Sequence, residues 1–211
     1  MEKTVNPMPI KKTLTDYLRL WFKWFLDPLG GFFNRLGITP NMMTMLGLIG
    51  NAIGAYFLAR GEMLTGGLFV LLMTPIDALD GTMARLRGES SDFGAFVDSV
   101  TDRYSELIIY GGLLYHFLFL GDPIGGLLVF GAAAGSVLVS YVKARAEALG
   151  YEAKVGILTR VERYLVLAPA LVFNQPFLGL GIIAVFANIT AVQRIWHVRG
   201  QAHIKMKRQE I

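Results

Sequence analysis

Long apolar segments recur along the chain, and they limit its fold more than any other feature of the sequence. A helix that crosses a membrane needs about 20 mostly apolar residues. The composition agrees, because 54% of the residues are hydrophobic and 17% are charged, against about 25% charged in typical soluble domains. The sequence therefore predicts an all-α integral membrane protein. The six predicted transmembrane helices are residues 42–59, 64–86, 93–120, 124–142, 161–173 and 177–197.

Aromatic and charged residues are mixed in the segment 13–33, before the first predicted span. Aromatic rings interleaved with cations are typical of an amphipathic helix that lies in the membrane interface. We expect Pro28 and the glycines after it to break this N-terminal interfacial helix. We predict a single membrane domain over residues 1–211, with an N-terminal arm (1–40), a six-helix bundle (41–198) and a cytoplasmic tail (199–211).

Basic residues predict the orientation of the chain. The N-terminal arm, the connections near residues 85–87 and 143–160, and the tail are rich in Lys and Arg. The alternate connections near residues 121 and 174 contain none, and the one near residue 61 contains only Arg60. Because Lys and Arg are retained on the cytoplasmic side, we predict a multi-pass protein of the cell membrane with both termini and the acidic cluster described next on the cytoplasmic side.

Four aspartates, Asp77, Asp80, Asp98 and Asp102, lie inside otherwise apolar segments. Spacings of three and four residues place each pair on one face of its helix. If the second and third spans form an antiparallel hairpin around a turn at residues 88–91, residues equally far from the turn lie at equal depth. Asp77 then faces Asp102, and Asp80 faces Asp98, so we expect all four carboxylates to converge.

Converging carboxylates inside a membrane are costly unless cations hold them ionised. The chain has no cysteine, so hard oxygen-seeking ions such as Mg²⁺, Mn²⁺ or Ca²⁺ are favoured, and four carboxylates suffice for two of them. Paired ions about 4 Å apart are a recurrent device for displacement at phosphate. The alternative is a structural ion-pair network with Arg85 and Arg103, or a water-filled vestibule, but two arginines cannot neutralise four carboxylates that share one face. The fifth aspartate of this segment, Asp92, is predicted to cap the third span.

Small residues accompany the aspartates. Gly81, Ala84 and Gly94 lack bulky side chains where a ligand or another backbone could approach. Helix packing alone would explain Gly81 equally well. Taken together, the small residues and the carboxylates predict a groove at the membrane edge.

The complete pattern resembles the signature of the CDP-alcohol phosphotransferase family. It reads DxxDGxxARx8GxxxDxxxD from Asp77 to Asp102. The resemblance implies transfer of a substituted phosphate from a CDP-linked lipid to an alcohol, with CMP leaving. It also implies two divalent cations, Mg²⁺ or Mn²⁺, held by Asp77, Asp80, Asp98 and Asp102, and a homodimer. No nucleic-acid partner is expected.

The same resemblance assigns roles to individual residues. Asp102 would be a metal ligand or the general base that deprotonates the acceptor hydroxyl. No serine, cysteine or histidine of the hairpin is placed as a covalent nucleophile, so direct displacement is the expected mechanism. The residues expected to bind the CDP-lipid are Asn41, Thr44, Asp77, Gly81, Ala84, Arg85 and Gly94.

The connection between the fourth and fifth spans predicts an acceptor site. If these spans form a hairpin, Ser140 lies level with Arg163, and Lys143 lies level with Arg160. A hydroxyl and three cations facing one pocket would suit a phosphate on the acceptor, and Arg194 from the last span could join them. The positive-inside rule alone would also place basic residues here.

Three short elements resemble the inositol-phosphate-binding elements of the prokaryotic phosphatidylinositol phosphate synthase branch of the family. They are SYVKARAE from Ser140, TRVER at residues 159–163 and VQR at residues 192–194. Thr159 and Val161 depart from the ERPER form of that branch. The resemblance implies transfer of the phosphatidyl group of CDP-diacylglycerol to myo-inositol 1-phosphate.

Other functions stay open at this point. A phosphatidylglycerophosphate synthase would use glycerol 3-phosphate, although the hairpin reads DSVTDR rather than the DPxADK of those enzymes. Free inositol, or an archaeal CDP-linked ether lipid, would be further variants. A divalent-cation transporter is a different class, but transporter sites usually lie near the midplane between inverted repeats, whereas these carboxylates cluster toward one face and no repeat is visible.

Overall fold

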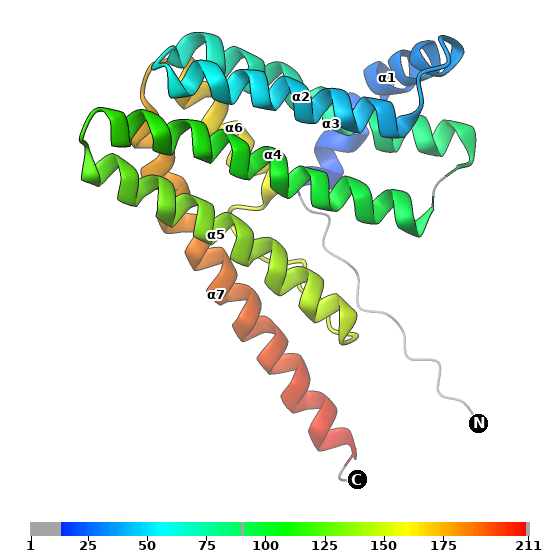
Figure 1. The fold of residues 1–211 in the computed structure, drawn as a ribbon. Coiled ribbons are helices and arrows are strands. Elements are labelled where there is room, and N and C mark those ends of the chain that lie inside the picture. The colour runs from blue at the N-terminus through cyan, green and yellow to red at the C-terminus, as the bar shows by residue number, and fades with distance from the viewer. Residues whose placement is uncertain (1–13, 90, 210–211) are drawn as a thin grey trace.

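The computed structural model of the chain describes residues 14–89 and 91–209, with side chains described for 22–89 and 91–207. Within these residues the fold consists of seven α-helices and contains no strand (Figure 1). The arm before residue 14, the side chains of residues 14–21 and Ser90 in the predicted turn lie outside the described part. The helices are α1 (Leu14–Arg35), α2 (Pro40–Ala59), α3 (Met63–Arg87), α4 (Asp92–Phe119), α5 (Pro123–Ala148), α6 (Arg160–Val172) and α7 (Pro176–Gln209).

Four helices are long and apolar enough to cross a membrane: α2, α3, α5 and α7. They confirm the predicted membrane-embedded, all-α architecture. The described parts of α4 and α6 do not meet the same measure, since α4 contains the charged residues Asp98, Asp102 and Glu106 and α6 has 13 residues. Six spans therefore stay a prediction.

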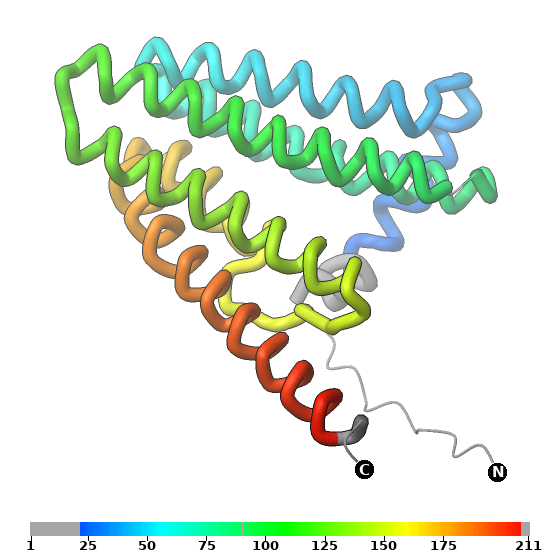
Figure 2. The backbone as a smooth tube through the Cα atoms, turned by 60° about the horizontal axis from the view of Figure 1, so that its bottom comes forward, coloured from blue at the N-terminus to red at the C-terminus, as the bar shows by residue number. Residues whose placement is uncertain are grey.

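The helices form two groups (Figures 1 and 2). Helices α2, α3 and α4 run side by side, with α2 packed extensively against both α3 and α4. Helices α5 and α7 form the other extensive pair, and α7 projects beyond the end of α5. Helix α6 packs against α3 and α7 and so joins the two groups.

The sequence predicted that α3 packs on α4 and that α5 packs on α6, and both predictions are wrong. Helices α3 and α4 run in opposite directions as predicted, but they are not among the extensively packed pairs of the described chain. Glycines explain why α2 is the common partner, because a side chain at Gly47 would overlap with α3 and one at Gly112 of α4 would overlap with α2. A Cβ atom at Gly54 would be in tight contact with α3, at 3.0 Å. Likewise α5 packs on α7 rather than α6, because residues 149–159 are long enough to carry α6 away from α5.

Two predicted helix features are also wrong. Helix α1 continues through Pro28, where the proline removes a single backbone donor, and Gly30 lies so close to α3 that a Cβ atom there would be 3.3 Å from Thr82 Cγ2. Asp92 does not cap α4: the Ser91 hydroxyl accepts from the Gly94 N–H at 3.0 Å, and Asp92 is the first helical residue. Helix α7 continues to Gln209, so most of the predicted tail is helical.

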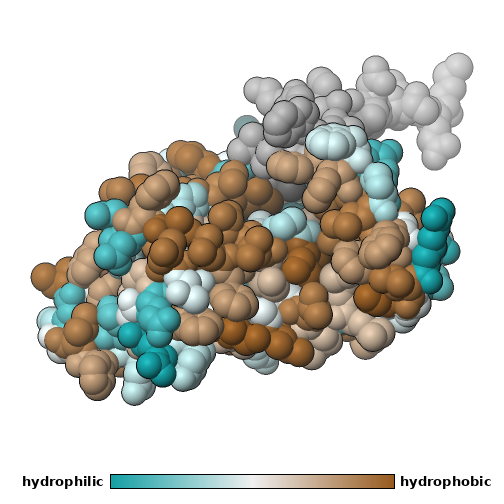
Figure 3. Space-filling model, turned by 90° about the horizontal axis from the view of Figure 1, so that it is seen from above, coloured by the Kyte–Doolittle hydropathy of each residue, from teal (hydrophilic) through white to brown (hydrophobic). Residues whose placement is uncertain are grey.

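Apolar side chains cover much of the outer surface. Trp24, Leu72, Phe119, Phe130 and Trp196 are all at least 60% exposed. Figure 3 shows brown apolar residues over much of one face, with hydrophilic residues toward its two ends. In water such a surface would be costly, whereas a bilayer accommodates it.

Candidate active site

The acidic cluster forms where α6 meets α3 and α4. Arg160, the first residue of α6, bridges Asp77 of α3 and Asp102 of α4 through its two terminal nitrogens. Its Nη2 lies 2.9 Å from Asp77 Oδ2, and its Nη1 lies 2.5 Å from Asp102 Oδ2. Asp77 and Asp102 therefore lie within reach of one guanidinium group, as their equal distance from the turn predicts.

The other two predicted ligands lie in the same cluster. Asp80 is 5% exposed and accepts from the Thr44 hydroxyl at 2.6 Å and from the Gly81 N–H at 2.5 Å. Asp98 interacts electrostatically with Asp77, Asp80 and Asp102. The four aspartates thus interact with one another, as the helical spacing predicts, and the Thr44 hydroxyl of α2 lies beside Asp80.

Arg85 and Arg103, the two arginines that could have neutralised the cluster, contribute little to its neutralisation. Arg103 Nη1 lies 3.8 Å from Asp102 Oδ2 and also donates to the backbone carbonyl of Ser99. Arg85 Nη2 donates to the Thr82 hydroxyl at 2.8 Å. The main counter-ion is instead Arg160, which the sequence predicted as an acceptor-binding residue.

The donor chemistry of the cluster fits a hard divalent cation. No three His, Cys, Asp or Glu side chains of the described chain are disposed as a ready-made metal cluster. The carboxylates nevertheless supply oxygen donors, lie inside a membrane-type fold and repel one another, which is the setting in which Mg²⁺ or Mn²⁺ is favoured. Arg160 occupies one oxygen each of Asp77 and Asp102.

One side of the cluster is open and another is closed. A side chain at Gly81 would meet nothing within 4 Å, and one at Gly94 would meet only Ser91 Oγ, at 3.2 Å. Asn41 is exposed and Ala84 is partly exposed. On the α2 side, any side chain at Gly47 would overlap with the Asp77 carboxylate. Gly47 was not predicted from the sequence, although its position three residues after Thr44 on the same helical face indicates it.

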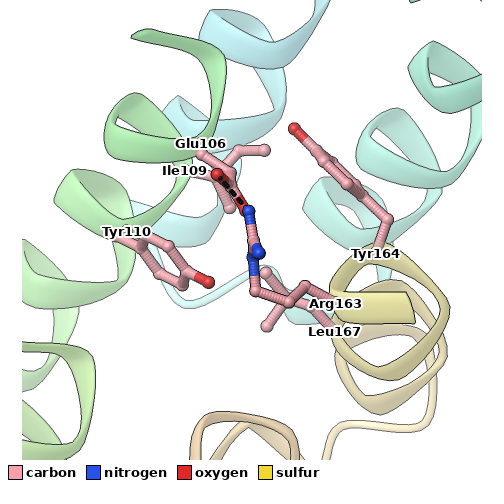
Figure 4. Close-up of a pocket in the computed structure, with 6 residues that line it drawn as sticks. All are labelled: Glu106, Ile109, Tyr110, Arg163, Tyr164 and Leu167. Carbon is pink, nitrogen blue, oxygen red and sulfur yellow. Dashed lines mark hydrogen bonds and ion pairs between the residues drawn. The ribbon is translucent and has the colours of Figure 1, made fainter. Parts of the chain in front are cut away.

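Arg163 forms a second ion pair, one turn deeper. Its Nε lies 2.7 Å from Glu106 Oε1 and its Nη2 lies 2.9 Å from Glu106 Oε2 (Figure 4). Arg163 is 1% exposed and Glu106 is 6% exposed. The small apolar pocket around the pair has no space for a water molecule. Sequence reasoning missed Glu106, whose place four residues after Asp102 is the signal that could have found it.

The remaining predicted acceptor residues are dispersed. Arg194 donates from Nε to the Val155 carbonyl at 2.9 Å and from Nη1 to the Val139 carbonyl at 2.6 Å, next to Ser140. Lys143 forms a partly exposed pair with Glu147 at 3.8 Å. Arg163 and Arg194 interact electrostatically. Arg163, Arg194 and Lys143 are thus each bound to a partner of their own, and the single acceptor pocket stays a prediction.

Fold and site together define a helical membrane protein with a buried carboxylate cluster of hard-cation type. The family model described as CDP-alcohol phosphatidyltransferase matches residues 37–196, and the chain belongs to this family. The predicted enzyme class is thereby confirmed in preference to a transporter.

The chain is also similar to individual proteins. The chain is 34% identical to a phosphatidylinositol phosphate synthase of Streptomyces avermitilis, over 95% of this chain and 88% of that protein. It is 33% identical to an archaetidylinositol phosphate synthase of Pyrococcus horikoshii, over 82% and 90% of the two chains.

The fold is also similar to solved structures of a phosphatidylinositol phosphate synthase of Mycobacterium tuberculosis, at 32% identity. The structure with CDP-DAG bound has a TM-score of 0.74, with 82% of this chain and 92% of that chain covered. The structure in complex with manganese and citrate has a TM-score of 0.75, with 82% and 88% covered.

Proposed function

We propose that the chain transfers the phosphatidyl group of CDP-diacylglycerol to myo-inositol 1-phosphate, giving phosphatidylinositol phosphate and CMP. The names of the bacterial relatives support this reaction. One structural observation carries the proposal: Arg160, from the TRVER element that resembles an acceptor-binding element, lies in direct contact with Asp77 and Asp102 of the acidic signature. The two motifs thus meet in one place.

The acidic cluster is proposed to hold two Mg²⁺ or Mn²⁺ ions through Asp77, Asp80, Asp98 and Asp102. The manganese complex of the Mycobacterium tuberculosis relative supports a divalent ion. When bound, such ions neutralise the diphosphate and stabilise charge on the departing CMP. Thr44 fixes the orientation of Asp80 by its hydrogen bond of 2.6 Å.

The CDP-lipid is proposed to lie along the open side of the cluster. The absence of contacts around Gly81 and the exposure of Asn41 support this placement. The bound CDP-DAG of the Mycobacterium tuberculosis relative supports the same donor class. The proposed lining residues are Asn41, Thr44, Asp77, Gly81, Ala84, Arg85 and Gly94.

Asp102 is proposed to take the proton of the acceptor hydroxyl. Asp102 is 8% exposed and its carboxylate lies beside Arg160, so water is largely excluded from it and an anionic acceptor would be drawn toward it. As the hydroxyl oxygen bonds to the lipid phosphorus, the bond from phosphorus to the CMP oxygen breaks, and the proton passes to Asp102. Mn²⁺ binding by Asp102→Asn and Asp77→Asn distinguishes this role from that of a metal ligand.

The acceptor phosphate is proposed to bind among Ser140, Lys143, Arg160, Arg163 and Arg194. Lys143 can bind an anion at the surface, since its side chain is 42% exposed and its pair with Glu147 is long, at 3.8 Å. Arg163 and Arg194 supply fixed positive charge, because their guanidinium groups are already bound to Glu106 and to backbone carbonyls. Arg160 would make the most direct contact.

The proposed setting is a six-span homodimer in the cell membrane with its active site on the cytoplasmic side. Arg85 and Arg87 lie in the last turn of α3, after Asp77 and Asp80, which agrees with the positive-inside rule.

An archaeal-type ether lipid is the second candidate donor, because the Pyrococcus horikoshii relative is an archaetidylinositol phosphate synthase. Purified protein given each CDP-lipid with myo-inositol 1-phosphate, glycerol 3-phosphate or inositol tests both proposals through CMP release. Release with glycerol 3-phosphate but not with inositol phosphate would contradict the proposed acceptor.

A further inference from the structure

Arg160 makes contacts that belong to two different proposed sites. Both of its terminal nitrogens are used on carboxylates of the proposed cation site, Asp77 and Asp102. Its Nε is buried and has no hydrogen-bond partner among the described residues. Its Cζ lies 5.6 Å from the centre of the Tyr164 ring, which can stack on a guanidinium group.

A divalent cation needs the same carboxylate oxygens. Mg²⁺ and Mn²⁺ bind carboxylate oxygens at about 2.1 Å, and a guanidinium group that lies 2.5 Å from Asp102 Oδ2 and 2.9 Å from Asp77 Oδ2 would face that ion at close range. Two cations that share these oxygens repel each other strongly. Arg160 and a bound ion therefore compete for Asp77 and Asp102.

The Arg160 side chain is placed so that it can leave the two carboxylates, whereas the nearby Arg163 is held in its ion pair. The side chain of Arg160 is 30% exposed, and Arg160 is the first residue of α6, directly after the long connection of residues 149–159. The Arg163 side chain is 1% exposed and makes a two-point pair with Glu106. The deeper pair can hold α6 in place while Arg160 changes partner.

We propose that Arg160 is an exchangeable counter-ion, which releases Asp77 and Asp102 when the divalent cation binds and then binds the phosphate of the acceptor. The inference rests on the proposed function, since it joins the cation site to the acceptor site. An anion that binds Arg160 keeps it away from Asp77 and Asp102, so that Arg160 no longer competes with the cation for them. Cation binding and acceptor binding must then strengthen each other by the same factor.

The size of the effect follows from the fraction of molecules in which Arg160 is paired. If it pairs with the carboxylates in about nine molecules of ten, the apparent cation affinity is lowered about tenfold. Arg160→Gln should therefore tighten Mn²⁺ binding about tenfold. Arg103→Gln is the matched control, because Arg103 also lies near Asp102, at 3.8 Å, but does not bridge to Asp77. Arg103→Gln shows how the loss of one positive charge by itself changes Mn²⁺ affinity, and we expect Mn²⁺ binding to tighten about twofold.

The test measures Mn²⁺ binding to purified protein in detergent, with electron paramagnetic resonance reporting the unbound Mn²⁺. We expect sulfate, compared with chloride at equal ionic strength, to tighten Mn²⁺ binding to the natural protein and to have no such effect on Arg160→Gln. Should Arg160→Gln not fold, Arg160→Lys serves instead, because lysine keeps the charge but cannot bridge two carboxylates in a fork. It too should bind Mn²⁺ more tightly than the natural protein.

The possible failures are distinguishable. Mn²⁺ binding that is equal in the natural protein, Arg160→Gln and Arg103→Gln, or weaker in Arg160→Gln, overturns the exchange while the proposed cation site stands. Equal tightening by both substitutions, without a sulfate effect, also overturns it. No Mn²⁺ binding by any of the proteins would contradict the proposed cation site and, with it, the exchange.

Discussion

Glu106 and Arg163 form a buried two-point ion pair that joins α4 to α6, with nitrogen to oxygen distances of 2.7 and 2.9 Å. The pair lies one helical turn from the contact of Arg160 with Asp102, on the same two helices. It therefore fixes the height at which α6 presents Arg160 to the acidic cluster.

Glu106→Gln should destabilise the fold, because it leaves Arg163 charged and buried without its partner. Breaking such a pair typically costs about 3–5 kcal/mol, which thermal unfolding in detergent would register as a clear fall in Tm. The acceptor KM should rise as well, since α6 is no longer fixed. Glu147→Gln is the control, because its pair with Lys143 is exposed at 3.8 Å and is worth about 0–1 kcal/mol. An equal fall in Tm for the two substitutions would show that the buried pair does not fix α6.

Asp102→Asn should lower kcat by at least about a hundredfold if Asp102 is the general base. Binding of the CDP-lipid should survive, because the substitution keeps the size of the side chain. Asp77→Asn, a change at the proposed metal ligand on the other side of Arg160, should instead weaken Mn²⁺ binding. Loss of Mn²⁺ binding to the same degree in both variants would make Asp102 chiefly a ligand.

Lys143→Ala should raise the acceptor KM and leave kcat nearly unchanged, because it removes a charge proposed to bind the acceptor phosphate and not the reacting hydroxyl. Steady-state kinetics with myo-inositol 1-phosphate measure this directly. Lys154→Ala is the control, since Lys154 is exposed in the connection before α6 and takes no part in the proposed site. An unchanged acceptor KM in Lys143→Ala would refute the contribution of Lys143 to the phosphate site.

Gly81→Leu should raise the KM for the CDP-lipid without loss of fold. A side chain at Gly81 meets nothing within 4 Å, so the protein itself has room for it, but the proposed donor site does not. Gly111→Leu is the matched control: it also lies in open space on a helix, but away from the cluster on α4. If both variants keep the natural KM, the donor does not lie along Gly81.

The acidic part of the site could be predicted from sequence because helices have a fixed rise and a fixed repeat. Equal distance from the turn near Gly88 placed Asp77 and Asp102 together, and their contacts with Arg160 agree with this. The partner itself could not be predicted, since Arg160 reaches them through packing of α6 on α3, a contact between distant parts of the chain.

The acceptor part was predicted less well. Its prediction required α5 and α6 to form a hairpin, but a long connection allows α7 to replace α6 beside α5. Arg163 consequently pairs with Glu106, and Arg194 donates to the Val139 carbonyl. An acidic residue inside an apolar helix was sufficient reason to expect a cationic partner for Glu106, although not to name Arg163.

The most direct test of the proposed function is the ratio of kcat/KM values for myo-inositol 1-phosphate and glycerol 3-phosphate, measured by CMP release from CDP-diacylglycerol in the presence of Mn²⁺ or Mg²⁺. We predict turnover with inositol phosphate, little turnover with glycerol 3-phosphate, and a selective loss of the former in Arg160→Gln. Preferred use of glycerol 3-phosphate, or turnover of inositol phosphate that does not depend on Arg160, would contradict the proposed function.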